Sequence, residues 1–265
     1  MQIRDVDLHV VDGGAGAPPF LLVHGYTGSS LDWADVQPSL AEHRRVVAYD
    51  QRGHGESTNT GDPASYTFDA LVADLGALVD ALDLAPFDLL GHSMGGIVAL
   101  RYALEHPEQV RSLILMDTFA EPAGALPQDM IDGLVAKART DGMGAVLEVM
   151  RPFMEGMMSQ QPPERRAVLA ARMERKIPNM DPEAFGSFAR ELNTYPSMVA
   201  RLGELAMPVT VLVGENDTNL VQPAHVMAAA IPGAELVVFP GAGHSPQEDD
   251  PAAWLAAVEK HLARC

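Results

Sequence analysis

Short apolar runs alternate with longer segments of helical periodicity along most of this chain. The runs are rich in leucine and β-branched residues, and several stop at a glycine or an aspartate. Such runs are typical of strands buried on both faces of a parallel sheet. Strands that alternate with helices need right-handed crossovers, which predicts an α/β fold with an open, doubly wound, mostly parallel sheet. The expected strands are VDLHVV (6–11), PFLLVHG (19–25), RRVVAYD (44–50), FDLLGHS (87–93), SLILMD (112–117), PVTVLVG (208–214) and AELVVFPG (234–241).

Between these runs, apolar residues recur at three- and four-residue spacing, which places them on one face of a helix. The expected helices cover 67–84, 96–104, 221–231 and 251–262. The segment 119–205 breaks the alternation, because it contains no expected strand and its helical patterns are split by prolines. We therefore predict a core formed by 1–118 and 206–265 and a helical cap, or lid, formed by 119–205, inserted after the sixth strand.

The expected cap contains nine methionines (Met130, Met143, Met150, Met154, Met157, Met158, Met173, Met180 and Met198). Methionine is flexible and polarizable, so a cap lined with it would suit varied apolar ligands. Apolar residues at helical spacing more often simply pack one element on another. Both interpretations of the methionines stay open.

Composition excludes several classes of partner. The chain has 36 acidic and 18 basic side chains and a net charge of −18, a balance that repels nucleic acid and anionic membrane surfaces. No apolar run is long enough to span a membrane, and the first residues lack the order of a signal peptide. The single cysteine, Cys265, cannot form an internal disulfide. We expect a cytoplasmic protein, a monomer or small homo-oligomer, that acts on a small molecule.

The pentapeptide GHSMG (91–95) places a serine, Ser93, between an expected strand and an expected helix. The pattern G-x-S-x-G in that context is typical of a sharp turn that exposes a nucleophilic serine. The alternative is that Ser93 is only the cap of the helix. Threonine or aspartate would serve a cap equally well, however, and a cap does not require a glycine on each side.

A nucleophilic serine needs a base, and the base needs an acid to orient it. His244 follows the last expected strand in a glycine-rich loop, and Asp217 follows the strand before it. Glu215 lies two residues from Asp217 and could compete for the role. Because all these loops follow strands, the order Ser93, Asp217, His244 predicts that the three side chains meet at one edge of the sheet.

Acyl transfer also needs hydrogen-bond donors for a developing oxyanion. The run LLVHGYTGSS ends a strand at His24 and Gly25, and the next backbone N–H belongs to Tyr26. We expect the backbone N–H groups of Tyr26 and Met94 to be these donors. No Cys/His cluster has metal-ligand spacing and no glycine-rich phosphate motif is present, so we predict no metal and no cofactor.

Five segments in order resemble the α/β-hydrolase superfamily over nearly the whole length of the chain. LLVHGYTGSS resembles the oxyanion loop, VAYDQRGHGES the D-x-R-G-x-G-x-S segment, GHSMGG the nucleophile elbow, VGENDT the acid turn and GAGHSP the histidine loop. The resemblance implies the α/β-hydrolase fold, with Ser93 as nucleophile, Asp217 as acid, His244 as base, and Tyr26 and Met94 as oxyanion donors.

Within that superfamily, a serine at position 93 is unlike haloalkane dehalogenases and epoxide hydrolases, which use aspartate there. Asp117 stands where some relatives carry the acid and is held as the alternate to Asp217. Asp249 stands where the family often has glutamate, a difference that bears at most on how the histidine loop packs. Asp50, Arg52 and His54 are expected to bond their own loop together.

These features predict a serine carboxylesterase that cleaves esters of small to medium apolar acyl groups through an acyl-enzyme on Ser93. A lactonase, a thioesterase or a C–C bond hydrolase would use the same residues. A ligand-binding receptor with vestigial catalysis belongs to another class, and the intact set of candidates disfavours it.

Overall fold

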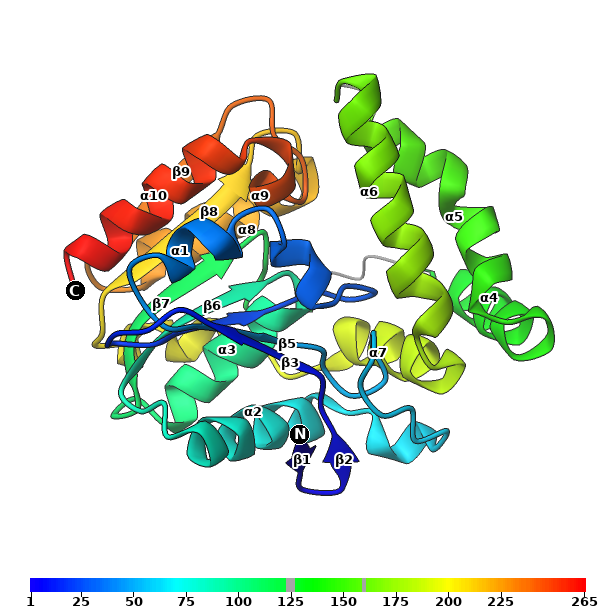
Figure 1. The fold of residues 1–265 in the computed structure, drawn as a ribbon, viewed down its shortest axis with the longest axis horizontal. Helices are drawn as coiled ribbons and strands as arrows, with labels where there is room; N and C mark the ends of the chain where they lie inside the picture. Colours follow the sequence, from blue (N-terminus) through cyan, green and yellow to red (C-terminus); the bar gives the residue numbers. More distant parts are fainter. Residues whose placement is uncertain (123–126, 159–160) are drawn as a thin grey trace.

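A computed structural model describes residues 1–122, 127–158 and 161–265, and its seven-stranded sheet has the order β3-β5-β4-β6-β7-β8-β9 (Figure 1). All neighbouring strands are parallel except β3, which runs antiparallel to β5 at one edge. The predicted doubly wound, mostly parallel sheet is therefore confirmed. The strands are β3 (Val10–Gly13), β4 (Phe20–Val23), β5 (Val46–Tyr49), β6 (Phe87–His92), β7 (Val110–Met116), β8 (Val209–Gly214) and β9 (Glu235–Phe239).

The single strand expected over 6–11 is wrong, because two short strands occupy this part of the chain. β1 (Gln2–Ile3) and β2 (Val6–Asp7) form a separate antiparallel pair, and β3 joins the main sheet. Between β2 and β3, the N–H of His9 donates to Ser57 Oγ at 2.8 Å instead of to a neighbouring strand. An alternating pattern predicts extended backbone, but it does not specify where pairing changes partner.

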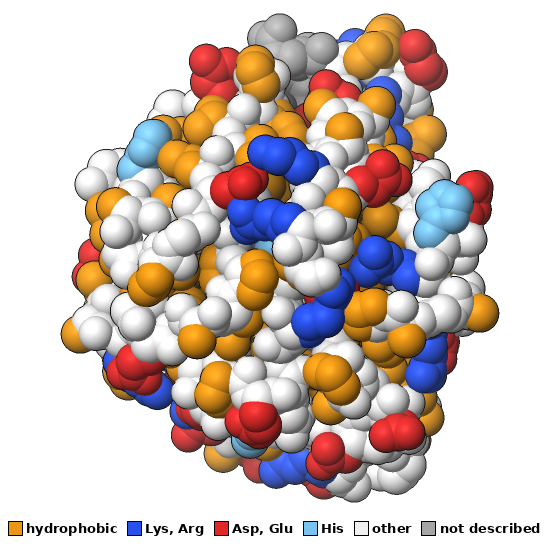
Figure 2. Space-filling view, turned by 90° about the vertical axis from the view of Figure 1, so that its left-hand side faces the viewer, with side chains coloured by type: hydrophobic (Ala, Val, Ile, Leu, Met, Phe, Trp, Pro, Cys, Tyr) orange, Lys and Arg blue, Asp and Glu red, His pale blue; other side chains and the backbone are white. Residues whose placement is uncertain are grey.

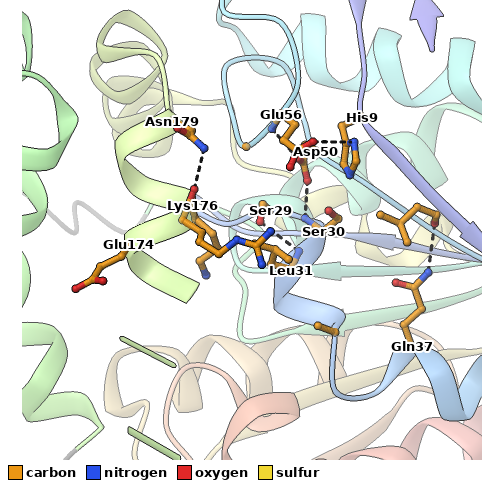
Figure 3. Close-up of a pocket in the computed structure, with 14 residues that line it drawn as sticks. His9, Ser29, Ser30, Leu31, Gln37, Asp50, Glu56, Glu174, Lys176 and Asn179 are labelled. Atoms are coloured by element: carbon orange, nitrogen blue, oxygen red, sulfur yellow. Dashed lines mark hydrogen bonds and ion pairs between the residues drawn. The ribbon is translucent and has the colours of Figure 1, made fainter. Parts of the chain in front are cut away.

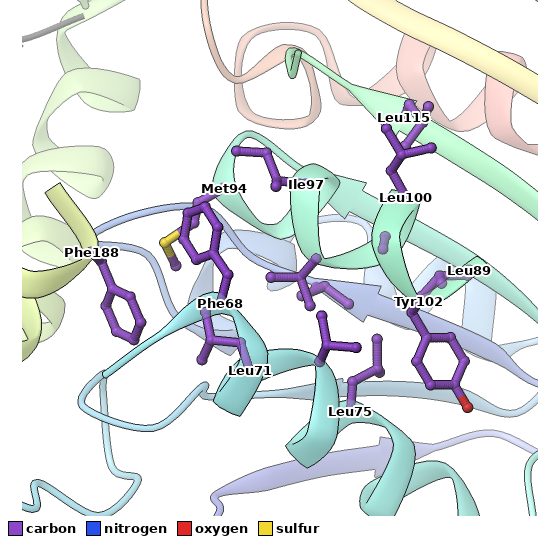
Figure 4. Close-up of a cluster of buried hydrophobic side chains, with 14 of the residues drawn as sticks. Phe68, Leu71, Leu75, Leu89, Met94, Ile97, Leu100, Tyr102, Leu115 and Phe188 are labelled. Atoms are coloured by element: carbon purple, nitrogen blue, oxygen red, sulfur yellow. The ribbon is translucent and has the colours of Figure 1, made fainter. Parts of the chain in front are cut away.

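Helices cover both faces of the sheet, as its two buried faces require. One face packs on α2 (Phe68–Leu82), α3 (Met94–Glu105) and α8 (Thr218–Ala230), and the other on α1 (Gln37–Ala41), η1 (Ser30–Trp33) and α10 (Pro251–Ala263). Figure 4 shows the first of these layers, in which side chains of α2 and α3 interdigitate and Phe188 joins them from a later helix.

The predicted helices 67–84 and 251–262 are confirmed, and their ends agree with the structure within two residues. Both helices begin after a residue whose side chain caps the first turn. Thr67 accepts a hydrogen bond from the Ala70 N–H, and Asp250 accepts one from the Ala253 N–H. The helices expected at 96 and 221 begin earlier, at Met94 and Thr218. Their first turns carry glycine or polar residues, which an apolar-face pattern cannot detect.

The residues described between β7 and β8 are helical and contain no strand, as expected. They form α4 (Gln128–Asp141), α5 (Met143–Met157), α6 (Pro163–Lys176), η3 (Ile177–Asn179), α7 (Pro182–Thr194) and η4 (Val199–Glu204). Pro163 and Pro182 begin helices, whereas Pro152 lies inside α5 and does not split it. These helices follow the fifth strand of the seven-stranded sheet in chain order, so the expected position after a sixth strand counts one strand too many.

Charged side chains of α6 fasten this helix to the body of the protein. Arg165 and Arg172 both pair with Asp35, and Lys176 pairs with Asp32 of η1. The side chains of Lys176 and Asp32 are only 11% and 7% exposed, so this pair is nearly buried. A buried charge without its partner is uncompensated and costly. The pair of Lys176 and Asp32 therefore makes the position of α6 specific.

The methionines between β7 and β8 mostly serve packing where they are described. Met143, Met158, Met180 and Met198 are buried, and Met150, Met154 and Met173 pack against the main core, whereas Met130 is about half exposed. The side chains of Met157 and Phe153 lie outside the described part of the structure.

The chain reverses its winding direction at β4, whose two neighbours are β5 and β6. The loops that follow β4 and β6 therefore meet at the carboxyl edge of the sheet, where α/β proteins place their sites. The amino ends of the parallel strands lie on the opposite side, where Figure 2 shows Lys and Arg side chains near the centre of the face. At that end Arg44 and Arg111 both pair with the buried carboxylate of Asp88. None of the described helices is long and apolar enough to cross a membrane.

Candidate active site

Ser93 lies at the turn between β6 and α3 in a strained backbone conformation. Its φ is 53° and its ψ is −120°, in a region that residues with a Cβ rarely adopt. The turn is fixed from both sides, since the Ser93 N–H donates to Met116 O at 2.9 Å and Ser93 O accepts from Thr118 Oγ1 at 2.7 Å. Gly95 allows the approach, because a methyl group there would lie 2.4 Å from the carbonyl oxygens of Val23 and His24.

The side chain of Ser93 makes no capping hydrogen bond, although Ser93 occupies the N-cap position of α3. Its hydroxyl is half-buried and has no hydrogen-bond partner in the described structure. The alternative that this serine is only a helix cap is therefore not supported. The strain at Ser93 instead holds a free hydroxyl at the sheet edge.

Asp217 and His244 lie together at the same edge. His244 Nδ1 donates to Asp217 Oδ2 at 2.5 Å, which leaves Nε2 as the free ring nitrogen. Glu215 does not compete, because its carboxylate accepts from the Gly241 N–H at 2.8 Å. An imidazole oriented in this way by a carboxylate can accept a proton at Nε2.

His92, the residue before Ser93, holds the backbone of His244. Its Nε2 donates to the His244 carbonyl oxygen at 2.7 Å, and the two rings lie 4.9 Å apart between centroids. Burial lowers the pKa of His92 to about 3, so the ring is neutral and its proton lies on Nε2. The contact of His92 with His244, 152 residues away, is not visible in any local pattern.

Asp249 ties the His244 loop to the helices that follow β7. Its Oδ2 accepts from the Gly243 N–H at 2.7 Å, and its Oδ1 accepts from Gln161 Nε2 at 2.7 Å. Arg165 adds a hydrogen bond from its guanidinium to the Glu248 carbonyl oxygen at 2.7 Å. Asp249 therefore takes part in packing the histidine loop, which is the role that the sequence left open for it.

The loop after β4 presents backbone donors beside Ser93. The neutral His24 ring accepts the Gln51 N–H at Nε2, so its Nδ1 donates to Gly25 O at 2.8 Å. The carbonyl of Gly25 and the N–H of Tyr26 belong to one trans peptide group and point in opposite directions. The hydrogen bond from His24 to Gly25 O therefore orients the Tyr26 N–H away from the His24 ring.

Gly25 lies directly against the serine, since a methyl group there would lie 3.0 Å from the Cβ of Ser93. Within the described residues, the N–H groups of Tyr26 and Met94 donate to no protein atom. Met94 is the first residue of α3, so its N–H is one of the free amides at a helix N-terminus. Both groups are available to an external oxygen atom.

The loop after β5 is bonded partly within itself, as predicted, and partly to other segments of the chain. Asp50 accepts the N–H groups of Ser30 and Glu56 at 2.6 and 2.8 Å, and Arg52 forms a buried ion pair with Asp74. These contacts support the neighbouring loops, whereas the buried Nε2 of His54 has no hydrogen-bond partner among the described residues.

Asp117 ends β7 next to this constellation. In the described chain, the atoms of Asp117, Asp217 and His244 that could bind a cation all lie within 4.8 Å of one another. The bond between His244 Nδ1 and Asp217 Oδ2 already uses two of these atoms. Asp217 and His244 therefore form a hydrogen-bonded pair with Asp117 beside it, and we assign the three residues no metal.

A cavity of about 270 Å³ lies between α6 and η3 on one side and the loops after β4 and β5 on the other (Figure 3). Its lining includes Ser30, Asp50, Glu56, Arg175 and Lys176. Neither Ser93 nor Asp217 nor His244 lines it. The cavity is thus separate from the candidate active site.

Comparisons with known proteins identify the family of the chain. Residues 18–251 match the family model of the alpha/beta hydrolase fold. The chain therefore belongs to the α/β-hydrolase superfamily.

Relatives and solved structures within this family differ in substrate. The chain is 32% identical to a 2-hydroxymuconate semialdehyde hydrolase of a Pseudomonas species, over 95% of this chain and 89% of the relative. It is similar to the structure of a thermophilic esterase from Thermogutta terrifontis, with a TM-score of 0.85, 30% identity and 98% and 94% coverage. An enol-lactonase from Burkholderia xenovorans has a TM-score of 0.85, 25% identity and 98% coverage of each chain.

Proposed function

We propose that the protein is a serine hydrolase that cleaves carboxylic esters of small to medium apolar acyl groups through an acyl-enzyme on Ser93. Asp217 would be the orienting acid, His244 the base, and the backbone N–H groups of Tyr26 and Met94 the oxyanion donors. The observation that carries the proposal is the 2.5 Å hydrogen bond from His244 to Asp217, at the sheet edge where the hydroxyl of Ser93 is free.

The geometry supports a two-step reaction. In the first step, Ser93 Oγ attacks the acyl carbonyl carbon while its proton passes to His244 Nε2, and the two N–H groups stabilise the charge on the carbonyl oxygen. The alcohol then leaves with that proton, and an ester to Ser93 remains. In the second step, His244 takes a proton from water, whose oxygen attacks this ester and releases the acid and Ser93.

An apolar side chain adjoins the candidate oxyanion site. Tyr26 stacks on Phe185 of α7 with ring centroids 5.4 Å apart, and the Tyr26 hydroxyl donates to Phe185 O at 2.7 Å. We propose that 119–205 acts as the cap of a core formed by 1–118 and 206–265, and that this aromatic contact favours an apolar acyl group. Figure 1 is consistent with the cap, since α4 to α6 stand beside the sheet, away from the helices on its faces.

A second candidate substrate uses the same residues. The relative that hydrolyses 2-hydroxymuconate semialdehyde and the enol-lactonase match this chain over nearly its full length. A lactone, or a C–C bond beside a ketone, is therefore the runner-up.

A substrate panel tests the proposal. Turnover would be measured on p-nitrophenyl esters of increasing acyl length, on lactones, on acyl thioesters and on a vinylogous diketone, with wild-type protein and the variants Ser93→Ala and Ser197→Ala. Ser197 is an exposed serine and serves as the matched control. We expect the esters to react fastest, S93A to lose turnover and S197A to retain it. Turnover of the lactones or the diketone alone would favour the second candidate, and equal activity of S93A would exclude a serine mechanism.

A further inference from the structure

Asp117 is a buried carboxyl group, and one of its oxygens has no hydrogen-bond partner among the described residues. It ends β7 at a φ of 42° and is 1% exposed. Its Oδ1 accepts the Gly214 N–H at 2.9 Å, whereas no donor of the described structure reaches its Oδ2. A carboxylate oxygen buried without a donor is costly, so this oxygen needs either a proton or a partner.

The nearest charged group is a second carboxylate. One side-chain oxygen or nitrogen atom from each of Asp117, Asp217 and His244 lies within 4.8 Å of the other two, and Asp217 already accepts the proton of His244 Nδ1. Two carboxyl groups at such a distance do not both ionise readily. The proton lies on Asp117, because Asp117 is the more buried of the two carboxyl groups and Asp217 already accepts the N–H of His244.

The carboxylates that face Asp117 act in the same direction as its burial. Burial raises the pKa of Asp117 well above its ordinary value, and the carboxylates of Asp217 and Asp249 raise it further, against the Gly214 N–H. His92, which contacts His244, is neutral and adds no positive charge.

We propose that Asp117 is protonated at neutral pH and is a positioning residue, whose hydroxyl donates a hydrogen bond to the Asp217 carboxylate and so holds Asp217 for His244. The proposal rests on the proposed roles of Asp217 and His244. It differs from a swap of acids, in which an ionised Asp117 would replace Asp217. A neutral Asp117 adds a donor to the site without adding a second negative charge beside the imidazole.

The variant Asp117→Asn separates these two possibilities. An asparagine copies the neutral acid, because its oxygen can accept the Gly214 N–H and its NH₂ group can donate to Asp217. We expect D117N to keep kcat/KM within about threefold, and D117A, which lacks the donor, to lose about tenfold, as for one hydrogen bond to a charged group. A collapse of D117N to the level of D217N would overturn the proposal.

The pH profile of kcat/KM separates a neutral Asp117 from an ionised one. Substituting a neutral acid by asparagine leaves the charge beside His244 unchanged, so the acid limb of kcat/KM should stay at the same pH. If Asp117 were ionised, D117N would remove a negative charge beside the imidazole and lower that limb by about one pH unit. Such a shift would contradict the proposal even if D117N remained active.

Infrared difference spectroscopy covers the case in which D117N does not fold. Wild-type protein at pH 7 should show the C=O stretch of a buried protonated carboxylic acid, and this band should disappear only above neutral pH. Its absence would overturn the proposal without any activity measurement. Failure of the serine mechanism is separate, because that failure would appear as undiminished turnover by S93A.

Discussion

His244 donates its Nδ1 proton to the carboxylate of Asp217 over 2.5 Å, although 27 residues separate the two in the chain. The side chain of Asp217 is 13% exposed and that of His244 is 32% exposed, so the hydrogen bond lies at the edge of the solvent. Two loops after neighbouring strands, β8 and β9, bring the pair together. If Asp217 fixes the tautomer of His244, its removal should damage catalysis more than folding.

Asp217→Asn should therefore lower kcat by about ten-thousandfold, because the amide forces the imidazole into the wrong tautomer. Steady-state kinetics on the best ester of the panel would measure the loss. Glu215→Gln is the matched control, since Glu215 bonds Gly241 and not His244. Comparable losses in both variants would show that the loop, and not the Asp217–His244 bond, is responsible.

The backbone of Ser93 is strained, so a substitution that relieves this strain should stabilise the protein although it removes the nucleophile. Ser93→Gly should raise the free energy of unfolding by about 1 kcal/mol, because glycine adopts a φ of 53° without a Cβ penalty. Ser93→Ala keeps the Cβ and should stay close to the wild type. Urea denaturation of the three proteins checks this, and equal stability of S93G and S93A would argue against stored strain.

The buried pair of Lys176 and Asp32 should contribute more to stability than an exposed pair. Lys176→Met leaves the Asp32 carboxylate uncompensated and should cost about 3 kcal/mol. Adding Asp32→Asn to it should recover part of the loss. The control is Lys137→Met, which breaks an exposed pair with Asp141 and should cost about 0.5 kcal/mol or less. A double-mutant cycle in urea gives the comparison, and a small effect of K176M would show that α6 is held by other contacts.

Acid should destabilise the protein partly through His54. Burial lowers the pKa of His54 to about 3 from an ordinary value of 6.5. The unfolded state therefore binds the extra proton first, so the stability contribution is present above pH 6.5 and is lost as the pH falls toward 3. His54→Gln should reduce the loss of unfolding free energy between pH 7.5 and 5 by about 2 kcal/mol.

The matched control for that change is His225→Gln, at an exposed histidine of α8. Its pH dependence should follow the wild type. If H54Q and H225Q had the same slope as the wild type, His54 would not be a buried neutral group.

The sequence predicted the sheet well, because strands buried on both faces must be apolar throughout. It also predicted which loops would meet, since the carboxyl ends of parallel strands share one edge. It missed the hairpin of β1 and β2 and the continuation of α5 through Pro152, because local patterns do not reveal what packs against a segment.

The contacts around the candidate site were less accessible to sequence reasoning. The hydrogen bond from His92 to the His244 backbone and the pair of Lys176 and Asp32 join residues far apart in the chain. The missing partner of one Asp117 oxygen likewise depends on which segments pack around it. Their charge states depend on burial, which composition does not give. The cytoplasmic location and the oligomeric state stay predictions.

Covalent labelling of the serine tests the central claim most directly. The protein would be treated with a fluorophosphonate, and intact mass and peptide mapping would locate the adduct in the wild type, in S93A and in S197A. If Ser93 is the nucleophile, we expect one adduct per chain, on Ser93, in the wild type and S197A, and none in S93A. An unlabelled wild type, or an adduct that persists in S93A, would contradict it.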